Sequence, residues 1–469
     1  MLTETYPLTD TIVAVATPPG QGGVGIVRLS GPEAIAIIRR ILAADPMKLP
    51  VFKPRYMYHG WAHVVVSGGI SGQPEPIDEV LAVSMPGPAS FTGEDVAEIH
   101  CHGGGAVLQA IIASACARGA RMAEKGEFTY RAFVNGKYDL TQAEAVAEII
   151  AAPSRQGVRL AQAKLSGLLG RRVTELRDTV EHLRARAALA IDFPDEEAES
   201  IGIDDFLADL NVVRGGITDL LAGYSRARHW REGVAVILAG QVNVGKSSLL
   251  NALLGRTRAI VSAVPGTTRD FIEESLDLDG LRVRITDTAG LRDTPDPVEQ
   301  EGVARALELA GDAELILLVT DASRPLNGEE RAFMEKHRGR VLLVRNKIDL
   351  PEIVAPDAGE CPTAAVSARM GQGLEELAAM VRRMALALGG ASDAEPEQGD
   401  IVPNLRQSRL LASALDEANA LAVDVSNGIA CDLFSVRLDA IAADLAEITG
   451  FAATDDILGR IFSNFCIGK

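Results

Sequence analysis

The segment from Val234 to Gly255 constrains the fold more than any other part of this 469-residue chain. It begins with VAVILAG, a continuous apolar run typical of a strand buried in a parallel sheet. The next residues, GQVNVGKSS, match the pattern GxxxxGK[ST], and SSLLNALLG has the apolar spacing of a helix. A strand, a glycine-rich loop and a helix in this order predict an α/β domain whose loop binds phosphate.

Strand and helix patterns continue to alternate after this segment, through VRITD, LILLVTD, VLLVRN and TAAVSA. We therefore assign residues 233–386 to a Ras-like P-loop domain with a doubly wound, mostly parallel sheet. Residues 136–232 carry apolar side chains at three- and four-residue spacing, as do residues 387–469 after a polar, Pro-containing linker. Because these helical stretches flank the α/β segment, we expect them to pack together as one helical bundle domain, with the α/β domain inserted between them.

The first 135 residues have a different pattern. Short β-like runs such as TIVAVAT and EVLAVSM alternate with Gly/Pro turns, and AVLQAIIASACARG reads as one apolar helix. This is typical of an α+β domain. The complete expectation is a multidomain α/β + α fold divided into residues 1–135, 136–232, 233–386 and 387–469.

Charge and cysteine content limit the partners and the location. The net charge of -18 has the wrong sign for a chain that binds nucleic acid over a broad surface, so any RNA contact should be local or made through a partner. No apolar run approaches the roughly 18 residues of a membrane span. Glu4 and Asp10 stand where a signal peptide carries positive charge. With 5 scattered cysteines and no CxxC pair, we expect a cytosolic protein with reduced thiols and no membrane contact.

The glycine-rich loop predicts contacts to phosphate and Mg²⁺. Gly240 and Gly245 permit the backbone angles that turn amides toward the phosphates. Lys246 neutralises the β and γ oxygens, which also assists catalysis, and Ser247 offers its hydroxyl to Mg²⁺. The nucleotide contacts expected here are Asn243, Val244, Gly245, Lys246, Ser247 and Ser248.

Two later motifs predict the remaining contacts near the γ-phosphate. Asp287 ends the strand VRITD, so its carboxylate can hold Mg²⁺ through water, and Gly290 lets the DTAG loop approach the phosphate. Thr267 and Thr268 lie between the two motifs, where a switch loop brings a hydroxyl to the metal. We favour Thr268 as metal ligand and catalytic contact, with Thr267 as the alternative. The contacts expected in this region are Thr267, Thr268, Asp287, Thr288, Ala289 and Gly290.

The base pocket is predicted by NKID at 346–349 and SAR at 367–369. Asp349 can accept hydrogen bonds from guanine N1–H and the 2-amino group, and adenine does not offer this pair. The expected pocket consists of Asn346, Lys347, Asp349, Ser367, Ala368 and Arg369. Since each motif follows a strand, in the order that GTP hydrolases use, the set predicts a GTPase domain.

The residue after DTAG leaves the activation of the attacking water open. It is Leu291, where many GTP hydrolases carry a glutamine that orients this water. Arg292 is a candidate arginine finger, although a solvent-exposed loop arginine is the favoured interpretation.

Four further blocks point to one family: TPPGQGGVGIVRLSG, FTGEDVAEIHCHGG, EFTYRAFVNGKYDLTQAEA and the terminal FCIGK. Together with the nucleotide-binding motifs they resemble the MnmE or TrmE family of tRNA modification GTPases, from about residue 11 to the last residue. The resemblance implies a GTP-hydrolysing subunit of a complex. That complex adds a carboxymethylaminomethyl or aminomethyl group to C5 of the wobble uridine of certain tRNAs.

The resemblance also implies partners and a one-carbon donor. It implies a homodimer through the N-terminal domains and a flavoprotein partner, MnmG or GidA, which supplies FAD and NADH and contacts most of the tRNA. The donor is a tetrahydrofolate, as the 5,10-methylene or 5-formyl derivative, bound to the N-terminal domain. Arg28, Lys137 and Lys469 match folate contacts of the family, and Lys469 requires the C-terminal tail to fold back. Glu98 can read the N–H and amino pair of a reduced pterin much as Asp349 reads guanine.

For the attacking water, the resemblance implies Glu299, in DPVEQEG, as the orienting residue. Without the resemblance, Glu299 reads as a carboxylate at a helix start. The resemblance also implies a potassium ion in place of an arginine, and a cation beside the bridging oxygen can stabilise transition-state charge in the same way. Its implied ligands are the Asn243 side chain and the loop that contains Ser262, Val264 and Thr267, once two GTPase domains dock face to face.

A second hypothesis belongs to a different class. The chain could be a GTP-switched binding protein that docks RNA or assists ribosome assembly, without one-carbon chemistry. Against it, no KH-like GxxG module follows the α/β segment.

Overall fold

The structure is a computed structural model that describes the chain in eleven ranges: 9–43, 51–64, 75–152, 154–192, 202–256, 273–287, 313–351, 354–355, 358–388, 400–429 and 431–469. Several predicted residues lie outside these ranges: Ser262, Val264, Thr267, Thr268, Thr288, Ala289, Gly290, Leu291, Arg292 and Glu299. The chain divides into two compact units. The first unit comprises Met1–Ala147, Lys164–Ile217 and Arg409–Lys469, and the second comprises Glu148–Ala163 and Thr218–Ser408.

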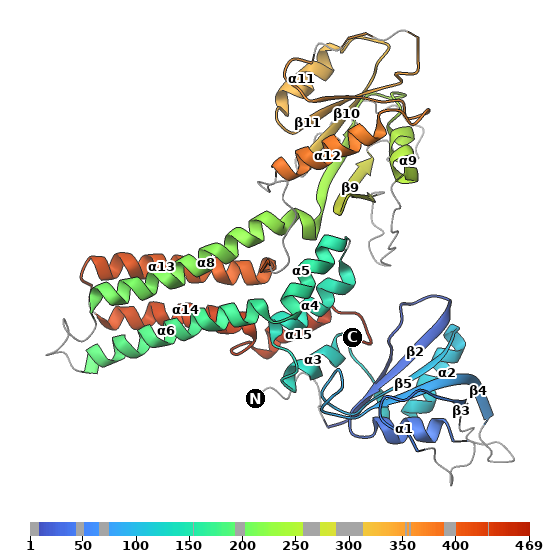
Figure 1. Cartoon of the computed structure of the whole chain (residues 1–469), viewed down its shortest axis with the longest axis vertical. Helices are drawn as coiled ribbons and strands as arrows, with labels where there is room; N and C mark the ends of the chain where they lie inside the picture. Colours follow the sequence, from blue (N-terminus) through green and yellow to red (C-terminus); the bar gives the residue numbers. More distant parts are fainter. Residues whose placement is uncertain are drawn as a thin grey trace. The chain divides into compact units, whose positions relative to one another are not determined.

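The first unit contains a six-stranded sheet with the order β3-β4-β5-β2-β1-β6 (Figure 1). Its strands are β1 (Thr11–Val15), β2 (Gly22–Ser30), β3 (Tyr58–Val64), β4 (Glu75–Met85), β5 (Val96–Gly103) and β6 (Ala120–Met122). Neighbouring strands are antiparallel except β1 and β6, which are parallel. The predicted α+β character of the N-terminal segment is confirmed.

Two helices, α1 (Ala34–Ile41) and α2 (Gly105–Cys116), cover one face of this sheet. Their buried side chains pack on alternate strand residues such as Leu29 and Ile99. Because successive strand residues point to opposite faces, the intervening positions of β2 and β5 lie on the other face. That face carries the residues of the second candidate site.

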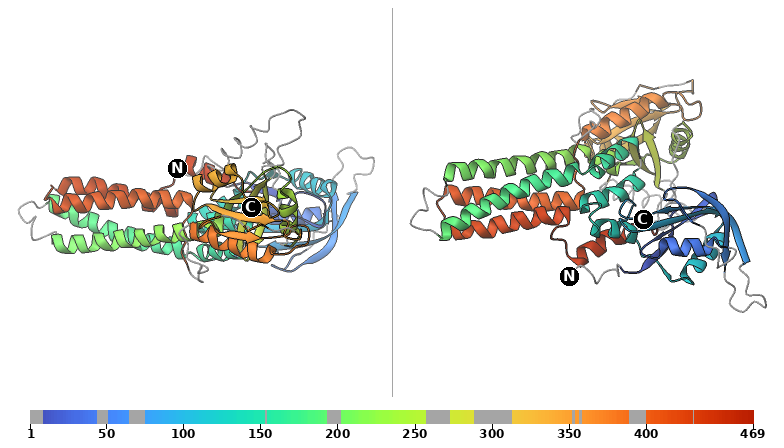
Figure 2. Two further views of the ribbon diagram at one scale, coloured as in Figure 1. Left: turned by 90° about the horizontal axis from the view of Figure 1, so that it is seen from above. Right: turned by 60° about the horizontal axis from the view of Figure 1, so that its bottom comes forward.

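The first unit also contains a bundle of long helices (Figures 1 and 2). The helices of the flanking stretches are α3 (Glu127–Val134), α4 (Leu140–Ala151), α5 (Arg155–Leu165), α6 (Leu168–Asp192), α8 (Ile203–Glu232), α13 (Leu405–Ser426), α14 (Cys431–Thr449) and α15 (Asp455–Ser463). Most of α5 and the second half of α8 belong to the second unit. Phe206 of α8 packs on Phe434 of α14 with ring centroids 5.8 Å apart. Arg184 of α6 pairs with Asp439 of α14 at 2.6 Å. Helices from before and after the α/β segment therefore form one bundle, as predicted.

The second unit contains another six-stranded sheet, with the order β12-β11-β10-β7-β9-β8. Its strands are β7 (Val234–Ala239), β8 (Glu273–Leu278), β9 (Leu281–Asp287), β10 (Leu315–Asp321), β11 (Val341–Asn346) and β12 (Thr363–Ala365). All neighbours are parallel except β8 and β9. The predicted mostly parallel sheet is confirmed.

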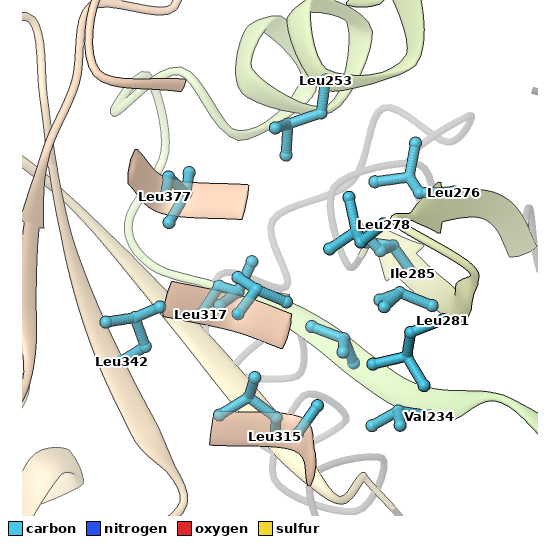
Figure 3. Close-up of a cluster of buried hydrophobic side chains, with 14 of the residues drawn as sticks. Val234, Leu253, Leu276, Leu278, Leu281, Ile285, Leu315, Leu317, Leu342 and Leu377 are labelled. Carbon is cyan, nitrogen blue, oxygen red and sulfur yellow. The ribbon is translucent and has the colours of Figure 1, made fainter. Parts of the chain in front are cut away.

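Helices cover both faces of this second sheet. Side chains of β7, β9 and β10 pack with Leu253 of α9 (Lys246–Arg256) and Leu377 of α12 (Leu374–Leu388) in one cluster (Figure 3). On the opposite face, Ile237 and Leu343 pack with Phe333 of α11 (Gly328–Lys336). Since both faces are buried, consecutive strand residues are apolar, which is why these strands read as continuous apolar runs. Within the described part of the chain, no helix has the length and apolarity needed to cross a bilayer.

Candidate functional site

The loop between β7 and α9 carries the phosphate-binding motif at the carboxyl end of β7. Gly240 has a φ of +138° and Gly245 a φ of +95°, which a residue with a side chain rarely adopts. A Cβ on Gly240 would lie against the Val319 carbonyl, and a Cβ on Gly245 against the Asn346 side chain. Both glycines are required by backbone angle and by close packing.

The side chains of this loop lie where phosphate and metal contacts are expected. Lys246 is 9% exposed, and its Nζ donates to the carbonyls of Gly240 at 2.8 Å and Gln241 at 3.0 Å, which keeps the positive charge inside the loop. Asn243 is exposed and has a φ of 64°, a left-handed angle unusual for a residue with a side chain. Val244 is buried, whereas Ser247 and Ser248 are exposed on the first turn of α9, whose N-terminus favours anions.

Asn346 links three of the predicted motifs. It is 2% exposed at the end of β11. Its Nδ2 donates to the Val244 carbonyl at 2.9 Å, and its Oδ1 accepts from the Ala368 amide at 3.0 Å. One amide side chain thus connects the phosphate loop, NKID and SAR.

Asp349 and Ser367 form the acceptor expected for the base. The Ser367 hydroxyl is buried and donates to Asp349 Oδ1 at 2.7 Å. This hydrogen bond holds the pKa of Asp349 below its usual value, so the carboxylate is ionised and can accept from guanine. Arg369, two residues after Ser367, is exposed.

Lys347 has a partner that sequence reasoning missed. It has a φ of 69°, and its Nζ pairs with Asp321 Oδ2 at 2.8 Å. Burial alone would raise the pKa of Asp321, but hydrogen bonds from Lys347 and Ser323 lower it to about 2. Asp321 ends β10 directly opposite Asn346 in register, and its place at a strand end was the available signal.

The structure describes only part of the expected metal site. The backbone of Asp287 ends β9 and is in register with Leu238 near the end of β7, the strand that leads into the phosphate loop. Ser247 and Asn243 are exposed residues whose side chains carry oxygen atoms, the ligand type that Mg²⁺ takes, so both stay the expected metal contacts of this loop. The remaining expected ligands, and Glu299, belong to the residues outside the described ranges and stay predictions.

A second cluster lies on the face of the N-terminal sheet opposite α1 and α2. Arg28 of β2 stands opposite Glu98 of β5, and Nε donates to Oε1 at 2.8 Å. The side chains are 17% and 14% exposed. His100 Nε2 lies 3.1 Å from Glu98 Oε2, so both carboxylate oxygens have partners. Burial alone would raise the pKa of Glu98, but Arg28 and His100 lower it below its usual value, which keeps the carboxylate ionised.

The C-terminal tail reaches this cluster. Arg28 Nη1 donates to the Gly468 carbonyl at 3.3 Å, and Ile467 forms an antiparallel bridge with Lys125. Gly468 has a φ of +91°, and a Cβ there would lie against the Val15 carbonyl. Lys469 is half-buried, and burial, followed by the charge of Arg28, lowers its pKa. The tail folds back as expected and brings Arg28, Glu98 and Lys469 together.

Lys137 is held differently from the other three. Its Nζ donates to the Pro88 carbonyl at 3.1 Å. Phe91 connects the two regions, because its ring packs 6.0 Å from that of Tyr138 and lies 5.8 Å from the Arg28 guanidinium carbon. Phe91 and Phe128 are neighbours of the cluster that sequence reasoning did not assign, since no spacing rule relates them to Arg28. Strand alternation places His100 on the same face as Glu98, but its pairing with that carboxylate was not predicted.

Known proteins resemble the chain along almost its whole length. Residues 140–466 match the family described as the MnmE helical domain, and residues 11–137 match the one described as GTP-binding protein TrmE N-terminus. A protein named tRNA modification GTPase MnmE from Nitratidesulfovibrio vulgaris (strain DP4) is 52% identical over 464 residues, which cover 98% of this chain and 99% of that protein. The protein of the same name from Lawsonia intracellularis is 42% identical, covering 98% of this chain and 100% of that protein.

The motifs, the two sheets and the helical bundle lie within these matched regions. The chain therefore belongs to the MnmE (TrmE) family of tRNA modification GTPases, and it binds and hydrolyses GTP in tRNA modification.

Proposed function

We propose that this GTPase holds the one-carbon donor for wobble-uridine modification on its N-terminal domain, and that it works as a homodimer with a flavoprotein partner. The observation that carries the proposal is the cluster of Arg28, Glu98 and the C-terminal tail. Arg28 and Gly468 are 440 positions apart, yet they share a hydrogen bond. A chain end held beside a partly buried ion pair brings polar groups from distant parts of the chain together, as ligand sites do.

The chemistry of the cluster suits a tetrahydrofolate. An ionised Glu98 can accept from the N–H and 2-amino groups of a reduced pterin. Phe91 is partly exposed and offers a ring face beside Arg28, at 5.8 Å from its guanidinium carbon, whereas Phe128 is fully buried beneath Arg28 and supports it from 5.9 Å. Lys469 and Lys137 would meet the carboxylates of the folate tail. When bound, the 5,10-methylene or 5-formyl donor supplies the methylene carbon, while these residues bind and orient it.

The proposed homodimer has a candidate surface on the N-terminal domain. Tyr56, Met57 and Trp61 are 65%, 45% and 49% exposed, and Leu81 of the adjacent strand is 42% exposed. They lie on or beside β3, which ends the strand order of its sheet. Exposed apolar side chains beside an edge strand favour pairing with another copy.

The partner we propose is the flavoprotein MnmG (GidA), which would supply FAD and NADH. It would also contact most of the tRNA. The net charge of -18 supports this division, because phosphate binding needs positive charge. We propose that the protein acts in the cytosol, where tRNA and GTP are available.

For hydrolysis, we propose that Ser247 and Thr268 hold Mg²⁺, with Asp287 acting through water, and that Glu299 orients the attacking water. Asn243 and the loop of residues 262–267 would hold K⁺, which would neutralise charge at the bridging oxygen when two GTPase domains meet. The corresponding domains are residues 1–135 for folate and dimerisation, 136–232 and 387–469 for the helical bundle, and 233–386 for GTP.

Calorimetric titration of the full chain with 5-formyltetrahydrofolate tests the proposed donor site. The wild type should bind, and Glu98→Gln should weaken binding roughly tenfold or more, because a charged acceptor is lost. Arg28→Met should act in the same direction.

A matched control is Glu79→Gln, which removes an exposed carboxylate of β4 that pairs with His59. It should leave folate binding unchanged. Should the wild type release no binding heat, or should Glu98→Gln bind as tightly as Glu79→Gln, the one-carbon role is wrong, while the GTPase assignment stands.

A further inference from the structure

β11 carries an arginine on a face where its other side chains are apolar. Val341 and Leu343 lie in the cluster that faces α11, and Arg345 continues that alternation. Arg345 is only 3% exposed. Burying a guanidinium group costs free energy unless its N–H groups find acceptors, so the contacts it makes explain its place.

The guanidinium group of Arg345 joins two loops. Its Nη2 donates to the carbonyls of Ala322 at 3.0 Å and Arg324 at 3.1 Å, in the loop after β10. The same Nη2 donates to the carbonyl of Val354 at 2.9 Å, after NKID. The Val354 amide in turn donates to the Ala322 carbonyl at 2.9 Å. An alkyl side chain of similar size would provide none of the three donor contacts.

The contact with Val354 closes the chain around the base-recognition motif. Residues 346–349 lie between Arg345 and Val354, so both ends of the segment that carries Asp349 are held by one side chain. The loop after β10 follows Asp321, the last residue of that strand and the partner of Lys347 at 2.8 Å. Lys347 has a φ of 69°, an angle that costs free energy and persists only where the surroundings enforce it.

The same loop also touches the phosphate loop. Arg324, whose carbonyl accepts from Arg345, donates through Nη2 to Gln241 Oε1 at 3.1 Å. Both its Nη atoms bond the Glu330 carboxylate, at 2.9 Å and 2.6 Å. The loop held by Arg345 is therefore connected to the base side and to the phosphate side of the nucleotide site.

We propose that Arg345 is a positioning residue for GTP: it holds the loops around NKID so that Lys347 and Asp349 meet guanine, and it does so without touching the nucleotide. It sets the affinity for guanine nucleotides and the selectivity for the 2-amino group. This inference rests on GTP binding and is independent of the proposed folate site.

If Arg345 contributed only to folding stability, its replacement would lower GDP affinity no more than a control substitution with the same loss of melting temperature. Arg345 Nη1 is buried and has no hydrogen-bond partner in the described part of the chain. Arg345→Met removes the cost of burying this charge, but it leaves the three carbonyls with one donor fewer, which costs stability. The melting temperature is therefore measured beside GDP affinity, so that a loss of positioning is separated from a loss of stability.

Competition of GDP, IDP and ADP against a fluorescent GDP, on the full chain, measures the effect. We expect Arg345→Met to raise the Kd for GDP roughly tenfold, about the loss of one charge-assisted hydrogen bond. IDP lacks the 2-amino group that Asp349 recognises. The ratio of the Kd for IDP to the Kd for GDP should therefore become smaller, because Asp349 is no longer held in place. The KM for GTP should rise while kcat stays within about twofold. Arg345→Lys should recover part of the affinity.

Arg340→Met is the matched control, because it removes another arginine–carbonyl bond next to β11. Arg340 donates to the Ala313 carbonyl at 3.1 Å and stands directly before β11, at the opposite end from NKID. Wild-type GDP affinity in both variants overturns the proposal. So does a loss of affinity that is equal in both and follows their melting temperatures. If Arg345→Met does not fold by circular dichroism, an unchanged GDP to IDP ratio in Arg345→Lys overturns it.

Discussion

The nucleotide site and the proposed folate site are assembled from the chain in opposite ways. The nucleotide site uses short motifs on loops that leave the carboxyl ends of parallel strands, from Gly240 to Arg369. In the other site, Arg28 meets a carbonyl 440 positions away. Contiguous motifs can be recognised by their spacing alone. A site made from distant single residues gives no such signal.

The two sites also differ in how they balance charge. Glu98 already has Arg28 and His100 as partners within the chain. The phosphate loop keeps one lysine against its own carbonyls, and Asn243 beside it is an exposed neutral amide. Hydrolysis has to neutralise the charge that develops between two phosphates, so the nucleotide site should depend on added cations far more than the folate site does.

Replacing K⁺ by Na⁺ at constant ionic strength should therefore have the largest effect. An arginine that meets the same transition-state charge contributes about 10³-fold or more, so we expect GTP turnover to fall by at least two orders of magnitude. Phosphate release measures turnover, and calorimetry in the same buffers should show unchanged 5-formyltetrahydrofolate binding.

Asn243→Ala should turn over GTP slowly in K⁺ and show no further loss in Na⁺. Val242→Ala, at an exposed neighbour, should keep the full dependence on K⁺. Equal turnover of GTP in Na⁺ and in K⁺ would contradict the proposed potassium site. The two sites would then no longer differ in their dependence on an added monovalent cation.

The same contrast explains how much of the molecule could be predicted. The second sheet was predictable because helices on both faces make its strands apolar throughout. The inserted topology followed from helical patterns on both sides of the α/β segment. The burial of Arg345 and its contacts could not be predicted, because VLLVRN has the pattern of a strand whether its arginine is buried or exposed. Asp321 could be found only as a residue at a strand end, since its pairing with Lys347 depends on strand order.

In the proposed folate site the sequence alone supplied little. Arg28 and Glu98 lie on a half-polar sheet face, where charged residues are ordinary. Arg28 lies opposite Glu98 because β2 pairs directly with β5, although β3 and β4 separate these two strands in the sequence. Lys137 donates to the Pro88 carbonyl, and its contact with the folate stays a prediction. Tertiary pairing, which no local pattern encodes, decides these positions.

Gly468→Ala should have an intermediate effect that is confined to the folate site. The residue has a φ of +91°, and an added Cβ would lie against the Val15 carbonyl. The left-handed angle alone costs roughly 1 kcal/mol, and the close contact adds to it, so the tail should leave its place beside Arg28. We expect 5-formyltetrahydrofolate affinity to fall about tenfold. GTP turnover of the isolated chain should not change.

Gly459→Ala is the control for this substitution. Gly459 lies inside α15, and a Cβ there would meet open space. Alanine should stabilise the helix by roughly 0.5 to 1 kcal/mol and leave folate binding intact. If Gly468→Ala binds the folate as tightly as Gly459→Ala, the tail is not part of the site.

The smallest effect should be the pH dependence of the Asp321–Lys347 pair in the nucleotide site. The pKa of Asp321 is about 2 in the folded chain, against 3.8 ordinarily. A carboxyl group with a lowered pKa contributes stability that is complete above its unfolded value and disappears as the pH falls through its folded value. The contribution should be constant from pH 7 to about 5 and decline between about 4 and 2. In urea unfolding, Asp321→Asn should lose roughly 1 kcal/mol or less relative to wild type at pH 7, because solvent screens this partly exposed pair, and the difference should shrink below about pH 4. In a Lys347→Met background the same substitution should cost less and vary less with pH, because Lys347, one of the two residues that lower the pKa, is gone while Ser323 remains. An Asp321→Asn difference that stays constant down to pH 3 in the wild-type background, and equal in both backgrounds, would show that this pair does not hold the base loop.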